Sequence, residues 1–229
     1  MSELLWFHAF GHGMRPKEFL RILYDGLRPK AGSQTQKWED ALDISPHCVY
    51  FYLGIADKGF GTTGLALPFS DVRGWLSPFD SGMLVEAHKP ICERTPAEKV
   101  VYLNAATFPT ARAPELIAKH PGAQLADYLD GKRPPHEGPH EHWPSIPAAP
   151  LWRENGWKAW LWEARVPNGT SVRTLVQWTC PGEDFDEAVE VLETTYSHDP
   201  VWVKAMFDCH FNGGVGPMWD ALRDRQLAP

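Results

Sequence analysis

A histidine near the start of the chain is the first residue whose surroundings suggest chemistry. His8 lies in the apolar run 4–10, and a second run, Cys48-Val49-Tyr50-Phe51-Tyr52-Leu53-Gly54, is aromatic and β-branched. A histidine on a strand that faces aromatic rings can donate to a sugar hydroxyl while the rings stack on a flat base. The structural alternative is that His8 is a satisfied core residue and that the three rings of the second run belong to the core.

A short polar segment is the second group with chemical potential. Ser77-Pro78-Phe79-Asp80-Ser81-Gly82 offers two hydroxyls and a carboxylate. Its proline and glycine favour a tight turn in which Asp80 accepts from amides of the same turn, and the functional alternative is that Asp80 contacts a substrate or a ribose. G-x-S-x-G is absent, so the segment is not a nucleophile elbow.

The third group is rich in metal-binding residue types. His136-Glu137-Gly138-Pro139-His140-Glu141-His142 nearly matches H-E-x-x-H. A zinc site of that kind needs its ligands on one helical face, and Gly138-Pro139 disfavours a helix there. We therefore expect a solvated loop without a metal site, and a metal-dependent hydrolase built on His136, His140 and His142 remains an alternative.

A carboxylate in the middle of an apolar strand is the fourth feature. In Trp160-Leu161-Trp162-Glu163-Ala164-Arg165-Val166, alternation places Glu163 and Arg165 on one face. A buried bare charge is costly, so Glu163 needs a partner. One interpretation is a structural pair of Glu163 with Arg165 on an exposed face. The other is a fixed carboxylate that stabilises developing positive charge in a water-poor site.

The elements that would position the first two groups can be predicted from periodicity and from turn residues. Residues 4–10 predict a strand, and residues 16–25 predict a helix that starts at Pro16 and is capped by Gly26. Residues 28–46 are polar and predict a surface loop, whereas 48–54 and 64–69 predict strands.

The second half of the chain predicts one hairpin and several helices. Residues 113–130 predict one or two short helices, and 131–150 predict a long proline-rich loop. Segments 158–166 and 171–179 predict two strands joined by the Asn168-Gly169 turn. An amphipathic helix is expected over 184–194, and a glycine-rich break at 213–217 precedes a C-terminal helix.

Composition limits the class of protein. The chain has 229 residues, is 43% hydrophobic and carries a formal charge of −7, which disfavours binding of duplex DNA through a broad basic face. No apolar window is long enough for a membrane span, and the N-terminus does not resemble a secretory signal. The four cysteines form no CxxC pair. We expect one cytoplasmic, soluble α+β domain over 1–229.

The order of several segments resembles the NAD-binding half of the ADP-ribosyltransferase-like fold. The segments are Phe7-His8, then Ile22-Leu23 with Gly26-Leu27, and then Val49-Tyr50-Phe51-Tyr52. The likeness covers residues 4–85 and the strand around Glu163. It departs from the family after the aromatic strand, where Gly59, Gly61 and Gly64 stand in place of a short helix.

The resemblance implies an enzyme of the glycosyltransferase class with NAD as its substrate. It implies split mixed or antiparallel sheets and ADP-ribosyl transfer or NAD glycohydrolysis, as in a toxin or defence effector. Glu163 would bind a ribose hydroxyl and orient the acceptor, and Tyr50 or Tyr52 would stack on the nicotinamide. The predicted cofactor-binding residues are His8, Phe51, Ser77, Asp80 and Ser81.

The partners that follow from the resemblance are NAD and an acceptor that the sequence does not identify. The acceptor could be a protein side chain, a nucleic-acid base or water. The main alternative is a protein without enzymatic activity, whose abundant tryptophan and proline serve an interaction surface.

Overall fold

The computed structural model describes residues 5–10, 13–53, 62–79, 81–84, 96–105, 107–118 and 160–227. Contacts divide the chain into two compact units, each built from separate chain segments. Unit 1 comprises 1–28, 54–71 and 170–229, and unit 2 comprises 29–53 and 72–169. The expected α+β class is confirmed, because each unit combines antiparallel strands with helices. A single domain over 1–229 stays a prediction.

Unit 1 contains three neighbouring strands of a sheet, in the order β1-β3-β7. They are β1 (Leu5–Phe10), β3 (Thr63–Pro68) and β7 (Gln177–Thr179). Leu65 of β3 lies opposite His8 on one side and opposite Trp178 on the other. Directly opposed residues share a face, so His8 and Trp178 lie on the same face of this sheet.

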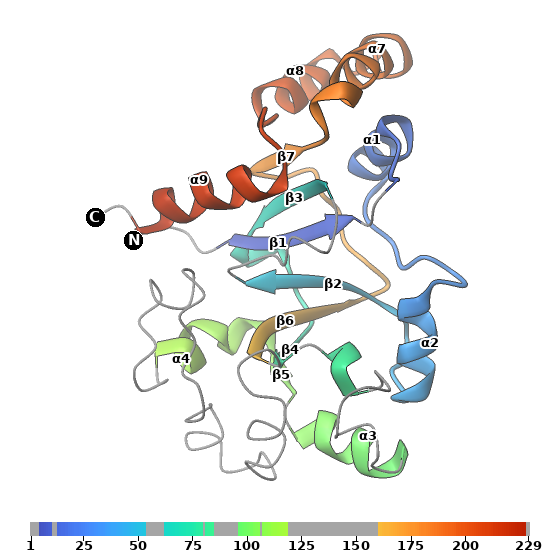
Figure 1. Ribbon diagram of the computed structural model, residues 1–229, viewed down its shortest axis with the longest axis vertical. Helices are drawn as coiled ribbons and strands as arrows, with labels where there is room; N and C mark the ends of the chain where they lie inside the picture. The colour runs from blue at the N-terminus through green and yellow to red at the C-terminus, as the bar shows by residue number, and fades with distance from the viewer. Residues whose placement is uncertain are drawn as a thin grey trace. The chain divides into compact units, whose positions relative to one another are not determined.

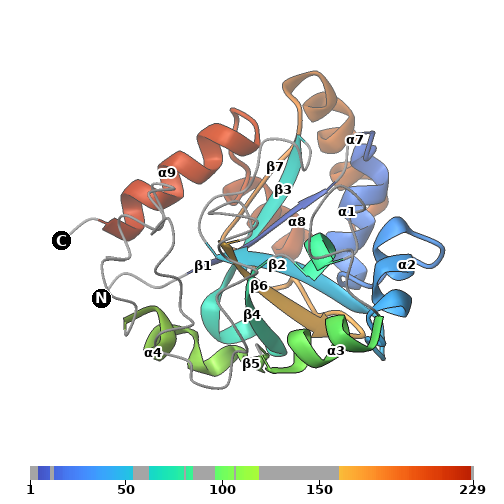
Figure 2. The same cartoon turned by 60° about the horizontal axis from the view of Figure 1, so that its bottom comes forward.

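Helices cover both faces of the unit 1 sheet (Figure 1). Phe19 of α1 contacts the rings of Phe10 and Trp178, at centroid distances of 5.1 and 5.4 Å. On the other face the Phe7 ring meets Trp219 of α9 edge-on at 4.0 Å. Helices α7 and α8 group with α1 (Figure 2), and Tyr24 of α1 stacks on Tyr196, which follows α7. The four helices are α1 (Pro16–Asp25), α7 (Phe185–Thr195), α8 (Pro200–Asp208) and α9 (Val215–Leu227).

Unit 2 contains four neighbouring strands in the order β5-β4-β6-β2, all antiparallel. Strands β4 and β6 approach so closely that a Cβ on Gly74 would lie 2.1 Å from the Arg165 carbonyl oxygen, which makes glycine necessary there. The strands are β2 (Cys48–Leu53), β4 (Trp75–Phe79), β5 (Phe108–Pro109) and β6 (Trp160–Pro167). The helices are α2 (Gln34–Ala41), α3 (Pro96–Ala105) and α4 (Ala113–Ala118).

Most of the expected early elements are confirmed. Strand β1, helix α1 and strands β2 and β3 lie where the sequence predicts them, and Gly26 ends α1 with φ of 96°. Helix α7 and a C-terminal helix are also present. The predicted loop at 131–150 and the thiol of Cys92 lie outside the described residues.

Three local predictions are wrong. The segment 28–46 contains helix α2, which Ser33 caps by accepting a hydrogen bond from the Gln36 amide. The segment starting at Ser77 is not a simple turn, because Ser77 lies within β4 and a 3-10 turn follows at Ser81–Leu84. The strands β6 and β7 form no hairpin, since β6 pairs with β2 and β4 whereas β7 pairs with β3.

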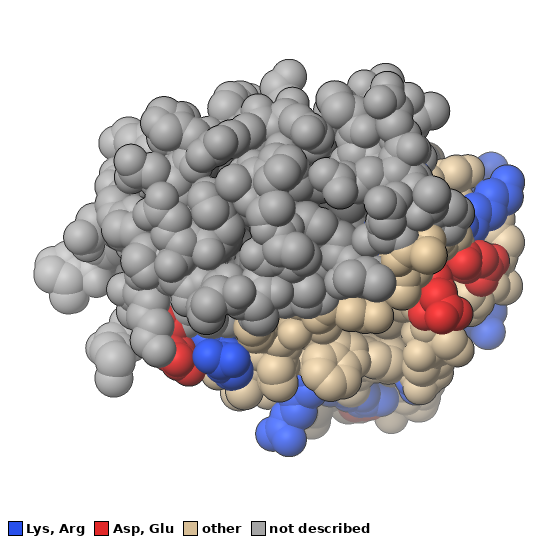
Figure 3. Space-filling view, turned by 90° about the horizontal axis from the view of Figure 1, so that it is seen from below, with Lys and Arg blue, Asp and Glu red and all other residues tan. Residues whose placement is uncertain are grey.

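The described surface shows no segregation of charge on the face drawn in Figure 3. On the described part of that face, Lys and Arg side chains lie beside Asp and Glu side chains. Among the described helices, none combines the length and the apolar character that crossing a membrane requires.

Candidate functional site

Strand register in unit 2 brings four of the predicted site residues onto one sheet face. Glu163 of β6 lies opposite Tyr52 of β2 on one side and opposite Ser77 of β4 on the other. In the adjacent row, Arg165 lies opposite Tyr50 and Trp75. Because opposed residues and alternate residues share a face, both rows form one continuous surface, which we call the Glu163 face.

Glu163 is a fixed and buried carboxylate. Its exposed fraction is 1%, and its Oε1 accepts from the Ser81 amide at 3.2 Å and from the Ser81 hydroxyl at 2.7 Å. Ser81 opens the 3-10 turn, so the carboxylate also caps that turn. Hydrogen bonds to a charged acceptor offset part of the cost of burying it.

Arg165 is the buried cation of the same face. Its Nη2 donates to Ser77 Oγ at 3.2 Å and to Thr107 Oγ1 at 2.6 Å. Its Nε has no hydrogen-bond partner among the described residues. Only 4% of Arg165 is exposed, so the suggestion that Glu163 and Arg165 form a pair on an exposed face is wrong about exposure.

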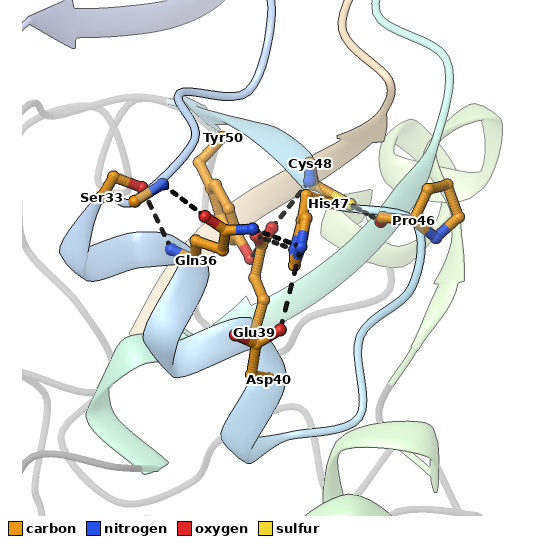
Figure 4. Close-up of polar contacts among 9 residues, drawn as sticks. Ser33, Gln36, Glu39, Asp40, Pro46, His47, Cys48 and Tyr50 are labelled. Atoms are coloured by element: carbon orange, nitrogen blue, oxygen red, sulfur yellow. Dashed lines mark hydrogen bonds and ion pairs between the residues drawn. The ribbon is translucent and has the colours of Figure 1, made fainter.

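The sequence did not point to a second buried carboxylate, Glu39 of α2. One of its oxygens, Oε1, accepts from the Cys48 amide at 2.7 Å and from the Tyr50 hydroxyl at 2.9 Å (Figure 4). The other, Oε2, lies 2.9 Å from His47 Nδ1, which is an ion-pair distance when the ring is protonated. The available signal was the spacing of Ser33 and Gln36, which matches the capping box that starts a helix.

The electrostatics of this face keep its phenol and thiol protonated. Burial, the charges of Glu163 and Glu39 and the hydrogen bond to Glu39 hold the pKa of Tyr50 far above its ordinary value. Burial and the neighbouring Glu39 raise the pKa of the Cys48 thiol to about 12. At neutral pH, Tyr50 therefore acts as a neutral ring and donor, and Cys48 is not a thiolate nucleophile.

The remaining predicted residues are placed elsewhere. Phe51 is fully buried and, by alternation, lies on the sheet face opposite Tyr50 and Tyr52, so its ring cannot stack with theirs on one ligand. His8 belongs to unit 1, where its partly buried ring meets Phe10 edge-on at 4.5 Å. Asp80 lies outside the described residues.

The histidine-rich segment also lies outside the described residues. His136, His140 and His142 therefore stay a prediction from sequence. Within the part of the chain that the structure describes, no three or more His, Cys, Asp and Glu side chains are grouped so as to hold a metal ion.

Comparisons with protein-family models, with curated proteins and with solved structures found no match for this chain.

Proposed function

We propose that the chain cleaves NAD at the bond between nicotinamide and ribose, in ADP-ribosyl transfer or NAD glycohydrolysis, on an ADP-ribosyltransferase-like fold. One observation supports this most. Glu163, the buried carboxylate held by Ser81, shares a sheet face with the partly exposed Tyr50 and Tyr52. These are the three residues that the resemblance selects as catalytic.

The chemistry suits a fixed anion beside aromatic rings. The bond from ribose C1′ to the nicotinamide nitrogen breaks, and its electron pair leaves with nicotinamide, which becomes neutral. The positive charge that develops on the ribose would be stabilised by the Glu163 carboxylate, whose position is already fixed in the folded protein. The acceptor then forms a bond to C1′ and releases a proton.

The aromatic residues would bind rather than react. Tyr50 keeps its proton because its pKa is raised, so it would contribute a ring that stacks on nicotinamide and not a base. Tyr52 lies on the same face, opposite Glu163. Phe51 is left out because it is buried on the other sheet face.

The test is release of nicotinamide from NAD. We expect wild-type protein to release it and Glu163→Gln to slow the release by about 100-fold or more, as loss of a fixed stabilising group does. Glu193→Gln, on the exposed side of α7, is the matched control and should leave the rate unchanged. Thermal unfolding of both variants verifies that they fold.

Two results would remove this proposal. One is wild-type protein that neither releases nicotinamide nor shifts its melting temperature with NAD. The other is Glu163→Gln at the wild-type rate. Labelled NAD identifies the acceptor, because free ADP-ribose indicates water and labelled macromolecule indicates a protein or a nucleic acid.

A further inference from the structure

Glu39 connects helix α2 to the candidate site through Tyr50. Its carboxylate, with an exposed fraction of 1%, contacts three groups around the start of β2: the His47 ring, the Cys48 amide and the Tyr50 hydroxyl (Figure 4). The contact with the Cys48 amide fixes the carboxylate relative to the backbone of the same strand that carries Tyr50. The hydrogen bond from the Tyr50 hydroxyl to Glu39 therefore fixes the end of the ring relative to β2, the strand that carries Tyr50.

The Tyr50 ring needs such a restraint because it forms part of the Glu163 face. Tyr50 is only partly buried, so packing alone does not enclose it. It lies opposite Arg165 and diagonal to Glu163, and diagonal neighbours of this size are within reach of each other. A ring that left Glu39 could thus bring its hydroxyl toward the Glu163 carboxylate.

We propose that Glu39 is a positioning residue that holds the Tyr50 ring in one orientation on the Glu163 face by accepting its hydroxyl hydrogen bond. Glu39 would touch neither NAD nor the acceptor. This inference rests on the proposed function in one respect, which is that the Tyr50 ring binds NAD. The orientation of the ring can be measured without NAD.

The first experiment measures the ring directly. Protein labelled with ¹³C in its tyrosine rings contains six such residues, and Tyr50→Phe assigns the Tyr50 resonance. We expect Glu39→Ala to shift or broaden that resonance. Glu39→Gln, which retains a side-chain oxygen acceptor, should leave it near its wild-type position. Asp43→Asn changes an exposed carboxylate just after α2 and is the matched control.

The second experiment measures NAD kinetics. Loss of one hydrogen bond predicts a KM for NAD raised roughly 3- to 10-fold in Glu39→Ala, with kcat within about twofold of wild type. Tyr50→Phe should give a similar increase, and the double variant should be no worse than either single variant, because both changes remove the same restraint. In Glu39→Gln, the KM for NAD should be close to that of wild type.

The outcomes separate this inference from the proposed function. An unchanged Tyr50 resonance in folded Glu39→Ala, or additive effects on KM, would overturn the positioning role. If Glu39→Ala fails to fold, Tyr50→Phe still decides, because it leaves the bond between Glu39 and the Cys48 amide intact. A KM for NAD in Tyr50→Phe equal to that of wild type would then overturn the positioning role. Wild-type protein that neither releases nicotinamide nor shifts its melting temperature with NAD refutes the NAD proposal, while the resonance of Tyr50 continues to test Glu39.

Discussion

At the scale of single residues, two buried carboxylates are held in the same way. One oxygen of Glu39 and one oxygen of Glu163 each accept from a backbone amide and from a hydroxyl. Such bonds are required for burial of any charge, whether or not it takes part in a reaction. Stability therefore cannot identify Glu163 as catalytic, and release of nicotinamide is the measurement that can.

His210 leads to a prediction about pH. Its ring stacks on Phe185 at 4.1 Å and meets Trp178 at 4.6 Å, and its Nε2 is buried with no hydrogen-bond partner among the described residues. Burial lowers the pKa of His210 below its ordinary value, so the unfolded chain binds this proton more readily than the folded protein does. The contribution of His210 to stability is complete above the unfolded pKa and falls as pH decreases through that value toward the folded pKa.

Replacement of His210 by phenylalanine tests whether this residue lowers stability as pH decreases. We expect His210→Phe to preserve the ring packing and to lose less unfolding free energy than wild type between about pH 7.5 and pH 5, a range that includes the ordinary histidine pKa. Urea unfolding at both pH values measures the difference. A variant that loses more stability than wild type on acidification would contradict the buried, neutral state of His210.

At the scale of elements, the sequence predicts those whose signals are local. Helix α1 has Pro16 in its first turn, apolar residues at helical spacing and Gly26 at its end, and these boundaries are confirmed. Helix α2 has few apolar residues, so periodicity missed it although its capping residues were present. The hairpin predicted at Asn168-Gly169 failed because a turn determines local direction only. Both residues do have positive φ, yet β6 and β7 pair with strands far away in sequence.

The candidate site also has features that local sequence predicts and features that depend on distant strands. Alternation predicts that Tyr50 and Tyr52 share a face, and the burial pattern of β2 agrees with it. The contact between Glu163 and Ser81 joins residues 82 positions apart. It depends on the register of β4 against β6, which no local pattern specifies.

The cap of α2 gives a prediction at this scale. Ser33→Ala removes the acceptor of the Gln36 amide and should destabilise the protein by about 0.5–2 kcal/mol. Ser33→Asp retains a capping oxygen and should remain close to wild type. Chemical denaturation measures both. Equal stability of Ser33→Ala and wild type would mean that α2 is held by its contacts with β2, Glu39 foremost, rather than by its cap.

At the scale of the whole molecule, neither unit is a continuous stretch of chain. Unit 1 draws on three segments and unit 2 on two, so the chain passes from one unit to the other four times. The last passage lies between Gly169 and Thr170, and all residues after it belong to unit 1. All residues of the Glu163 face, together with Glu39, come before it, whereas β7 and the helices α7, α8 and α9 come after it.

A chain that stops at Gly169 separates the two units experimentally. It retains every segment of unit 2 but removes from unit 1 the core contributed by α9, so that Phe7 and Ala66 lose the side chains of Met218 and Trp219 that cover them. Exposure of the apolar side chains that α9 covers should unfold unit 1, because burial of apolar surface contributes about 25 cal/mol per Å² to the free energy of folding. Hydrogen exchange should therefore show unprotected amides in β1 and β3 and protected amides in β2 and β6. Loss of protection in all four strands would show instead that the two units unfold as one, and that the Glu163 face exists only in the complete chain.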